Sequence, residues 1–314
     1  MSTGRTHLWA SWKRLYLQHW AVTNISVTDT PQCCVRFTIP GLSTDCFDGD
    51  GNPNIDSIMK ISGISRVYFF DKPLDDSGKR FLDFNVMLKD RLLFTVSTHF
   101  RISKLLYNPD IPKWPINGQY SLSNVGNSSL TDKISFYSPD ITSEPLWTQR
   151  SQLVSVNNDT RQPSALPDWF QHKYKGKGGM DKGLAVMPIQ RPLNTYSYPI
   201  TVQWLDTDFF RHTNFSSYIN WVLNAIYSSL SKQEIEPAQC SSSSAFLPGV
   251  ARAALSRGVK DLQIRYISES LENQNLNVYV WQEESQKNKF FASVERENLQ
   301  VCQLQLEYFD SCTD

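Results

Sequence analysis

A turn in the second half of the chain gathers side chains that can carry acid–base chemistry. In the segment DTDFFRHTN, Asp208 stands four residues before His212, and Asp206 comes two residues earlier. A carboxylate can act as a general base toward water or attack a carbonyl carbon directly. An imidazole can orient such a carboxylate or move protons near neutral pH. The turn is therefore a candidate hydrolytic site.

The same residue types also have purely structural uses. Asp206 and Asp208 can cap the turn or the helix that follows it. Asn214 can bond the backbone of the turn. A single histidine such as His212 is often a core residue whose hydrogen bonds are satisfied. On these residues alone, the catalytic and the structural interpretation both stay open.

The elements on either side of the turn would position it. Residues 198–204 (YPITVQW) alternate apolar and polar side chains, which predicts a strand. From Ser216 to Leu230, apolar residues lie on nearly every side, which predicts a helix buried all round. The first amides of such a helix have no partner within it and point toward the turn. Asn214, Phe215 and Ser216 are therefore candidates to support the turn and a developing oxyanion.

The first half of the chain repeats this order of elements. Residues 35–40 alternate as a strand, a turn rich in Asp, Asn and Gly follows over 45–54, and 55–71 carries apolar residues at helical spacing. Several alternating segments come after the helix in each half, and those of the second half include Leu262–Tyr266. A long helix followed by an antiparallel sheet, used twice, is an α+β architecture.

Composition narrows the class of protein. Lys+Arg and Asp+Glu are 31 each, so net charge favours neither nucleic acid nor an anionic membrane. No apolar run reaches the roughly 18 residues of a membrane span. The six cysteines form no C-x-x-C pair, and we expect reduced thiols. No G-x-S-x-G elbow, phosphate-binding loop, dinucleotide fingerprint or metal motif is present, so no cofactor and no metal are expected.

The N-terminus leaves the compartment open. Residues 1–28 contain no Asp or Glu, and their basic and apolar side chains suit either an amphipathic presequence or a helix packed on the protein. We expect an intracellular location, cytoplasmic or mitochondrial or in another organelle. Whether the chain associates as a homodimer stays open.

A family resemblance begins in the strand, turn and helix of the second half. Residues 202–221 read V-x-W-x-D-T-D-x-x-x-H-x-N-x-x-x-Y-I-x-W, which resembles the signature of hotdog thioesterases. Within them the chain is most similar to the plant-type acyl–acyl-carrier-protein thioesterases, which carry two hotdog domains. LQIRYISES (262–270) resembles that family's strand ending in Tyr-x-x-Glu-Cys, and 151–167 resembles its inter-domain strand and turn. The first half resembles that family's first hotdog domain, mostly in its pattern of elements.

The resemblance implies a set of site residues. Asp208, His212 and Glu269 fall on the family's catalytic Asp, His and Glu. Asp208 would serve as base or nucleophile, Glu269 as the second carboxylate and His212 as the residue that orients them. Phe210 stands where the family has a catalytic Asn, and Ser270 stands where it has Cys. The candidate substrate contacts are Phe210, Ser270 and Tyr218.

These observations predict two fused hotdog domains that hydrolyse a fatty-acyl thioester carried on coenzyme A or a carrier protein. The predicted parts are an N-terminal extension (1–32), a first hotdog domain without the catalytic turn (33–170), a linker (171–194) and a catalytic second domain (195–314). A non-catalytic acyl-binding or scaffold protein is the first alternative, and the residues at 210 and 270 favour it. A hotdog hydratase is the second.

Overall fold

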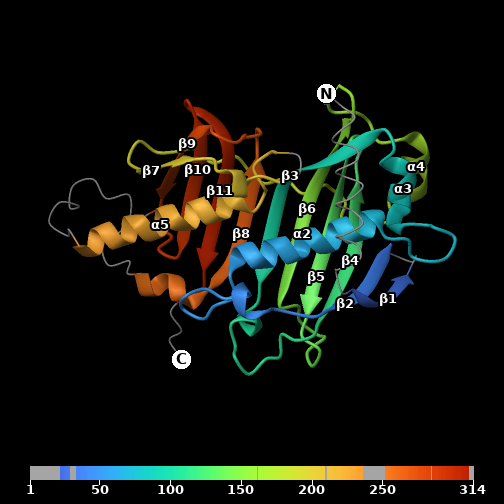
Figure 1. The fold of residues 1–314 in the computed structure, drawn as a ribbon, viewed down its shortest axis with the longest axis horizontal. Helices are drawn as coiled ribbons and strands as arrows, with labels where there is room; N and C mark the ends of the chain where they lie inside the picture. Colours follow the sequence, from blue (N-terminus) through green and yellow to red (C-terminus); the bar gives the residue numbers. More distant parts are fainter. Residues whose placement is uncertain are drawn as a thin grey trace. The chain divides into compact units, whose positions relative to one another are not determined.

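The computed structural model describes residues 22–28, 33–160, 162–208, 211–235, 252–283 and 285–310. Most of the predicted N-terminal extension and Phe210 lie outside the described residues. The chain forms two compact units (Figure 1). Unit 1 holds the described residues up to Ser43 together with Lys60–Thr95 and Asn108–Leu184. Unit 2 holds Thr44–Met59, Val96–Tyr107 and the residues from Ala185 onward.

The first half of the chain contributes six strands. They are β1 (Thr23–Thr28), β2 (Cys34–Ile39), β3 (Arg91–Ile102), β4 (Ile116–Val125), β5 (Ser129–Tyr137) and β6 (Trp147–Asn157). Its helices are α2 (Ile55–Asp71), α3 (Phe84–Met87) and α4 (Asp168–Tyr174). The strands follow the order β1-β2-β4-β5-β6-β3.

The second half contributes β7 (Tyr196–Thr201), β8 (Val259–Tyr266), β9 (Asn275–Trp281), β10 (Lys289–Arg296) and β11 (Leu299–Tyr308), with one long helix, α5 (Ser217–Ile235). Its strands follow the order β7-β9-β10-β11-β8. Counted from β7, this order is first, third, fourth, fifth, second. Counted from β2, the first-half series β2-β4-β5-β6-β3 has the same order. The predicted repetition of one strand and helix arrangement is therefore confirmed.

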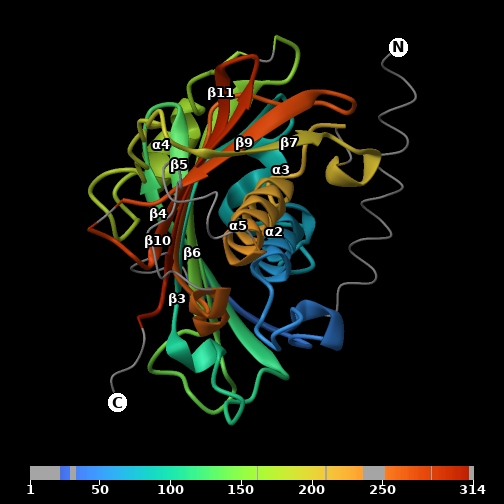
Figure 2. The ribbon, with the colours of Figure 1, turned by 90° about the vertical axis from the view of Figure 1, so that its left-hand side faces the viewer.

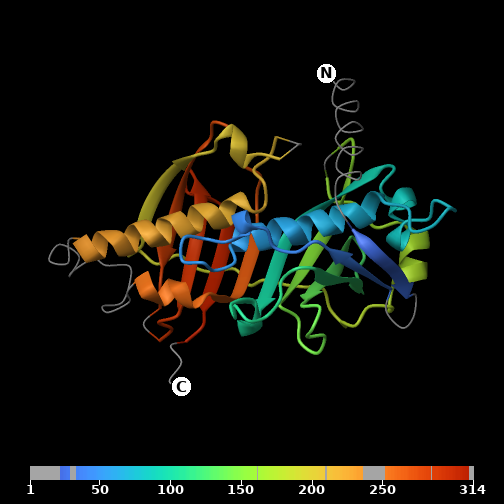
Figure 3. The same ribbon diagram turned by 60° about the horizontal axis from the view of Figure 1, so that its bottom comes forward.

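Both long helices are largely buried, as was predicted for the helix of the second half from its apolar pattern. Lys60 is the one exposed residue of α2. In unit 1, Phe69 of α2 packs on Phe37 of β2 and on Tyr120 of β4. In unit 2, α5 contacts β7 and β9 and crosses the strands on one face (Figures 2 and 3). Burial of these apolar faces supplies most of the stability of such helices.

Parts of the predicted linker (171–194) pack on the rest of the protein. Helix α4 runs to Tyr174, inside that segment, and buries Phe170 and Tyr174. Farther along, the side-chain amide of Gln303 accepts from the Ile189 amide at 3.1 Å and donates to the Ile189 carbonyl at 2.6 Å. Arg191 pairs with the buried Glu295 at 3.0 Å. Polar contacts of this kind leave no apolar period in the sequence, so the pattern could not reveal them.

A polar pair between β3 and β8 in unit 2 leads to a prediction of how stability depends on pH. His99 of β3 contacts Asp261 of β8 at 2.6 Å, and Gln263 donates to the same carboxylate. Partial burial opposes ionisation of Asp261, but these hydrogen bonds, with the charges of His99 and Arg101, outweigh it and lower the pKa of Asp261. The carboxylate therefore adds stability above the pKa it has in the unfolded chain, about 3.9. That contribution is lost as pH falls through the lower folded value.

We expect Asp261→Asn to unfold at a lower urea concentration than wild type at pH 7. At pH 3 and below, the difference between the two proteins should shrink, because the wild-type carboxylate is then losing its charge. Urea midpoints measured at both pH values check this. An equal difference at both would show that the ionised carboxylate contributes nothing.

Candidate active site

The turn before α5 is built by its own hydrogen bonds. The Asp208 amide donates to the His212 carbonyl at 2.8 Å, and the His212 amide donates to Oδ1 of Asp208 at 3.2 Å. Asp206 belongs to the short 3-10 turn Trp204–Asp206, where its carboxylate accepts from the Gln203 amide. The structural interpretation of Asp206 is therefore confirmed, and Asp208 also serves the turn.

The helix start is fixed in the same way. The Asn214 amide donates to the Asp206 carbonyl at 2.7 Å, and Oδ1 of Asn214 accepts from the Ser216 amide at 3.1 Å. The Phe215 carbonyl accepts from the Tyr266 hydroxyl at 3.1 Å. Within the described part of the chain, the Phe215 amide has no acceptor. The amide of Ser216 is thus used by the cap, and Phe215 carries the candidate oxyanion donor; its role stays a prediction.

The first half contains a counterpart of this turn, 160 residues earlier in the chain. The Asp48 amide donates to the Asn52 carbonyl at 2.8 Å, and the Asn52 amide donates to Oδ1 of Asp48 at 2.9 Å. The Asn54 amide then donates to the Cys46 carbonyl at 2.7 Å, as that of Asn214 does to Asp206. The first half was predicted to have no catalytic turn. Its backbone turn is present, but Asn52 occupies the place of the imidazole.

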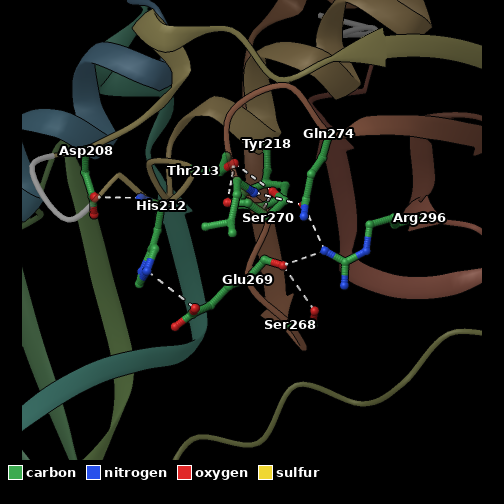
Figure 4. A network of polar contacts seen from close by, with 10 residues as sticks. Asp208, His212, Thr213, Tyr218, Ser268, Glu269, Ser270, Gln274 and Arg296 are labelled. Atoms are coloured by element: carbon green, nitrogen blue, oxygen red, sulfur yellow. Dashed lines mark hydrogen bonds and ion pairs between the residues drawn. The ribbon is translucent and has the colours of Figure 1, made fainter. Parts of the chain in front are cut away.

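The imidazole of His212 turns away from its own turn toward the end of β8. Its Nε2 lies 3.4 Å from Oε2 of Glu269, and the exposed fractions of the two side chains are 23% and 58%. In Figure 4, the ring lies between the carboxylates of Asp208 and Glu269. The structure therefore brings the three predicted catalytic residues to one place. His212 contacts Glu269 through its ring and Asp208 through its backbone.

The loop that carries Glu269, between β8 and β9, is held from β10. Arg296 of β10 donates to the Glu269 carbonyl at 3.4 Å and to Oε1 of Gln274 at 2.8 Å (Figure 4). The same Oε1 accepts from the Leu271 amide at 3.0 Å. Arg296 and Gln274 were not predicted, because no local motif marks an arginine that acts on a loop 27 residues away along the chain.

Two predicted substrate contacts lie in the interior instead. Ser270 is fully buried and Tyr218 is 4% exposed. Their hydroxyls lie 2.8 Å apart, and the Ser270 hydroxyl is 2.6 Å from that of Thr213. Burial raises the pKa of Tyr218, so its hydroxyl stays protonated. We therefore interpret these side chains as internal partners. Phe210, the third predicted contact, lies outside the described residues.

Three further observations describe the chain. Within the described residues, no helix is long and apolar enough to cross a membrane. Among the same residues, no three His, Cys, Asp or Glu side chains are grouped as metal ligands. Cys33, Cys34, Cys46 and Cys302 are buried free thiols.

Comparison with known proteins now places the fold. Residues 190–239, which include the turn and all of α5, match the family model of the acyl-ACP thioesterase C-terminal domain. No curated protein sequence matches the chain significantly.

Solved structures extend the likeness over most of the chain. A 12:0-ACP thioesterase from Umbellularia californica has a TM-score of 0.61 at 15% identity, over 88% of this chain and 98% of that one. An acyl-ACP thioesterase from Bacteroides thetaiotaomicron has 0.57 at 13%, over 88% and 98%. A protein described as an oleoyl thioesterase from Lactobacillus plantarum has 0.62 at 12%, over 90% and 99%.

The predicted resemblance is therefore confirmed, and the fold is that of a double-hotdog protein. The segment that carries Asp208 and His212 further matches the C-terminal domain of acyl-ACP thioesterases. At these identities the structural likeness establishes the fold, whereas the roles of individual residues stay predictions.

Proposed function

We propose that this protein hydrolyses a fatty-acyl thioester to a free fatty acid and a thiol, at the site formed by Asp208, His212 and Glu269. The observation that supports this most is the contact between His212 and Glu269. It joins the end of β8 to a turn that matches the C-terminal domain of acyl-ACP thioesterases. The similarity to proteins that act on acyl-ACP favours a carrier-protein thioester over acyl-coenzyme A as substrate.

The reaction needs a base, an oxyanion donor and an acid for the leaving group. We assign the base to Glu269, because its carboxylate is accessible to water and lies beside the imidazole. It would take a proton from water while the water oxygen bonds to the carbonyl carbon. The Phe215 amide is the candidate donor to the developing oxyanion. Glu269 would pass the proton on to Nε2 of His212. The carbon–sulfur bond then breaks, and His212 would give that proton to the thiolate, which leaves both side chains in their starting states.

Asp208 is the second carboxylate of the site. Its Oδ1 is already hydrogen-bonded to the His212 amide, and its negative charge would stabilise positive charge on the imidazole while that ring carries the proton in transit. Direct participation of Asp208 as the base is the alternative assignment, since it lies on the opposite side of the ring in Figure 4.

A panel of acyl thioesters tests the function. We expect thiol release from acyl-carrier-protein substrates above the rate without enzyme, with a preferred chain length, and slower release from the matching acyl-coenzyme A. Free thiol and fatty acid should appear in equal amounts. Binding of acyl thioesters without thiol release would instead support an acyl-binding protein, and addition of water to an enoyl thioester would support a hydratase.

A further inference from the structure

The contact between His212 and Glu269 is too weak to fix the two side chains on its own. The Glu269 side chain is more than half exposed, and exposed ion pairs contribute about 0–1 kcal/mol because water screens them. A catalytic pair must nevertheless keep its geometry closely, since a misplacement of about 1 Å can cost roughly 100-fold in rate. The separation of these two side chains must therefore be set by the backbones that carry them.

Those backbones are joined by residues next in sequence to the pair. Thr213 follows His212, and Ser270 follows Glu269. The Thr213 amide donates to the Ser270 carbonyl at 2.9 Å, and the Thr213 hydroxyl donates to the same carbonyl at 3.1 Å. His212 and Leu271 also form an isolated antiparallel bridge. The two segments thus meet at one buried point (Figure 4).

The three hydroxyls at this point form a closed set of hydrogen bonds. Each hydroxyl has a single proton to donate. One assignment satisfies these contacts: Thr213 donates to the Ser270 carbonyl, Ser270 donates across the 2.6 Å contact to Thr213, and Tyr218 donates across the 2.8 Å contact to Ser270. In this assignment every proton is used, as is usual for buried polar groups.

We infer that the buried hydroxyls of Thr213, Ser270 and Tyr218 are positioning residues that hold His212 and Glu269 at reacting distance. The inference rests on the proposed function for its catalytic meaning. Tyr218 lies in the first turn of α5, so the cluster ties the helix start, the turn and the end of β8 together. It also accounts for a hydroxyl at position 270, where the resembled family has Cys. A thiol is a weaker donor and would not reproduce a 2.6 Å contact.

Isosteric substitutions test this role. Thr213→Val and Tyr218→Phe each remove one hydroxyl and keep the shape of the side chain. We expect each to lower kcat roughly 10- to 100-fold while KM changes less than about threefold, because binding is retained and alignment is lost. Thr213→Ser keeps the hydroxyl and should restore most of kcat. Ser293→Ala is the matched control, since Ser293 is a buried hydroxyl of the same unit that bonds Glu295 instead.

If Ser293→Ala loses stability but keeps its kcat, destabilisation alone does not slow the reaction. A kcat within twofold of wild type in both Thr213→Val and Tyr218→Phe would overturn the inference. So would failure of Thr213→Ser to recover activity that Thr213→Val has lost.

A second readout does not depend on turnover. In a crystal structure of Tyr218→Phe or Thr213→Val, we expect the distance between Nε2 of His212 and Oε2 of Glu269 to exceed 4 Å. An unchanged distance in both variants would overturn the positioning role. If wild type hydrolyses no acyl thioester, the proposed function fails, but this distance still decides whether the cluster sets the geometry.

Discussion

Glu269→Gln is expected to lower kcat for acyl-thioester hydrolysis by at least about 100-fold, the usual effect of removing a general base. Glutamine has the same shape and can still accept a hydrogen bond, but it cannot take a proton from water. The side chain is 58% exposed, so the substitution should leave the unfolding midpoint nearly unchanged. Steady-state kinetics and thermal unfolding of the same preparation check both parts.

Asp208→Asn gives the companion measurement. Asparagine can still accept from the His212 amide, so the turn should remain and any loss of rate should reflect the lost charge. We expect kcat to fall at least about tenfold, equivalent to 1.4 kcal/mol.

Asp48→Asn is the matched control for that substitution, because Asp48 accepts from the Asn52 amide in the corresponding turn of the first half, which has no imidazole. It should leave kcat unchanged. Equal losses in Asp208→Asn and Asp48→Asn would mean that both carboxylates act only on folding.

Arg66→Met is expected to destabilise the protein by about 3–5 kcal/mol, the usual cost of leaving one member of a buried ion pair alone. Nε of Arg66 lies 2.7 Å from Oδ2 of Asp132, and the two side chains are 7% and 0% exposed. Arg66 also donates to Ser151 at 2.6 Å, and Tyr120 donates to Asp132 at 3.1 Å. Burial raises the pKa of Asp132 even with Arg66 beside it. Without Arg66, the carboxylate must be buried with its charge uncompensated or take up a proton.

Urea unfolding at pH 7 measures this effect, and two variants control it. Arg66→Met combined with Asp132→Leu should recover most of the loss, because the buried charge is removed as well. Lys260→Met breaks the exposed pair with Glu307 and should cost less than about 1 kcal/mol. A loss in Arg66→Met no greater than that of Lys260→Met would show that the buried pair is not a major source of stability.

The helices and strands could be predicted where a regular pattern covers a whole element. Helix α2 was expected over 55–71 and is Ile55–Asp71, and α5 begins one residue after the expected Ser216. The strand order could not be predicted, because pairing depends on contacts between distant segments. The Arg66 and Asp132 pair shows the same limit: an arginine in an apolar helix signals a buried partner, but nothing marks a residue 66 positions away as that partner.

The candidate site was predicted in part. Asp208, His212 and Glu269 were found together because the resemblance covers their motif, and the structure places them side by side (Figure 4). The sequence could not show that Ser270 and Tyr218 point into the interior, because a strand end and a helix start each have two sides. It also could not show that Asp48 and Asp208 form matching turns, since the two segments share few residue types.

A structure with a non-hydrolysable acyl thioester, in which a methylene group replaces the sulfur, tests the central claim most directly. We predict that its carbonyl lies at the start of α5, with its carbon within reach of a water held by Glu269 and its oxygen near the Phe215 amide. His212 should face the methylene that stands for the sulfur. If the analogue is bound at full occupancy and its carbonyl lies away from His212 and Glu269, the proposal is contradicted.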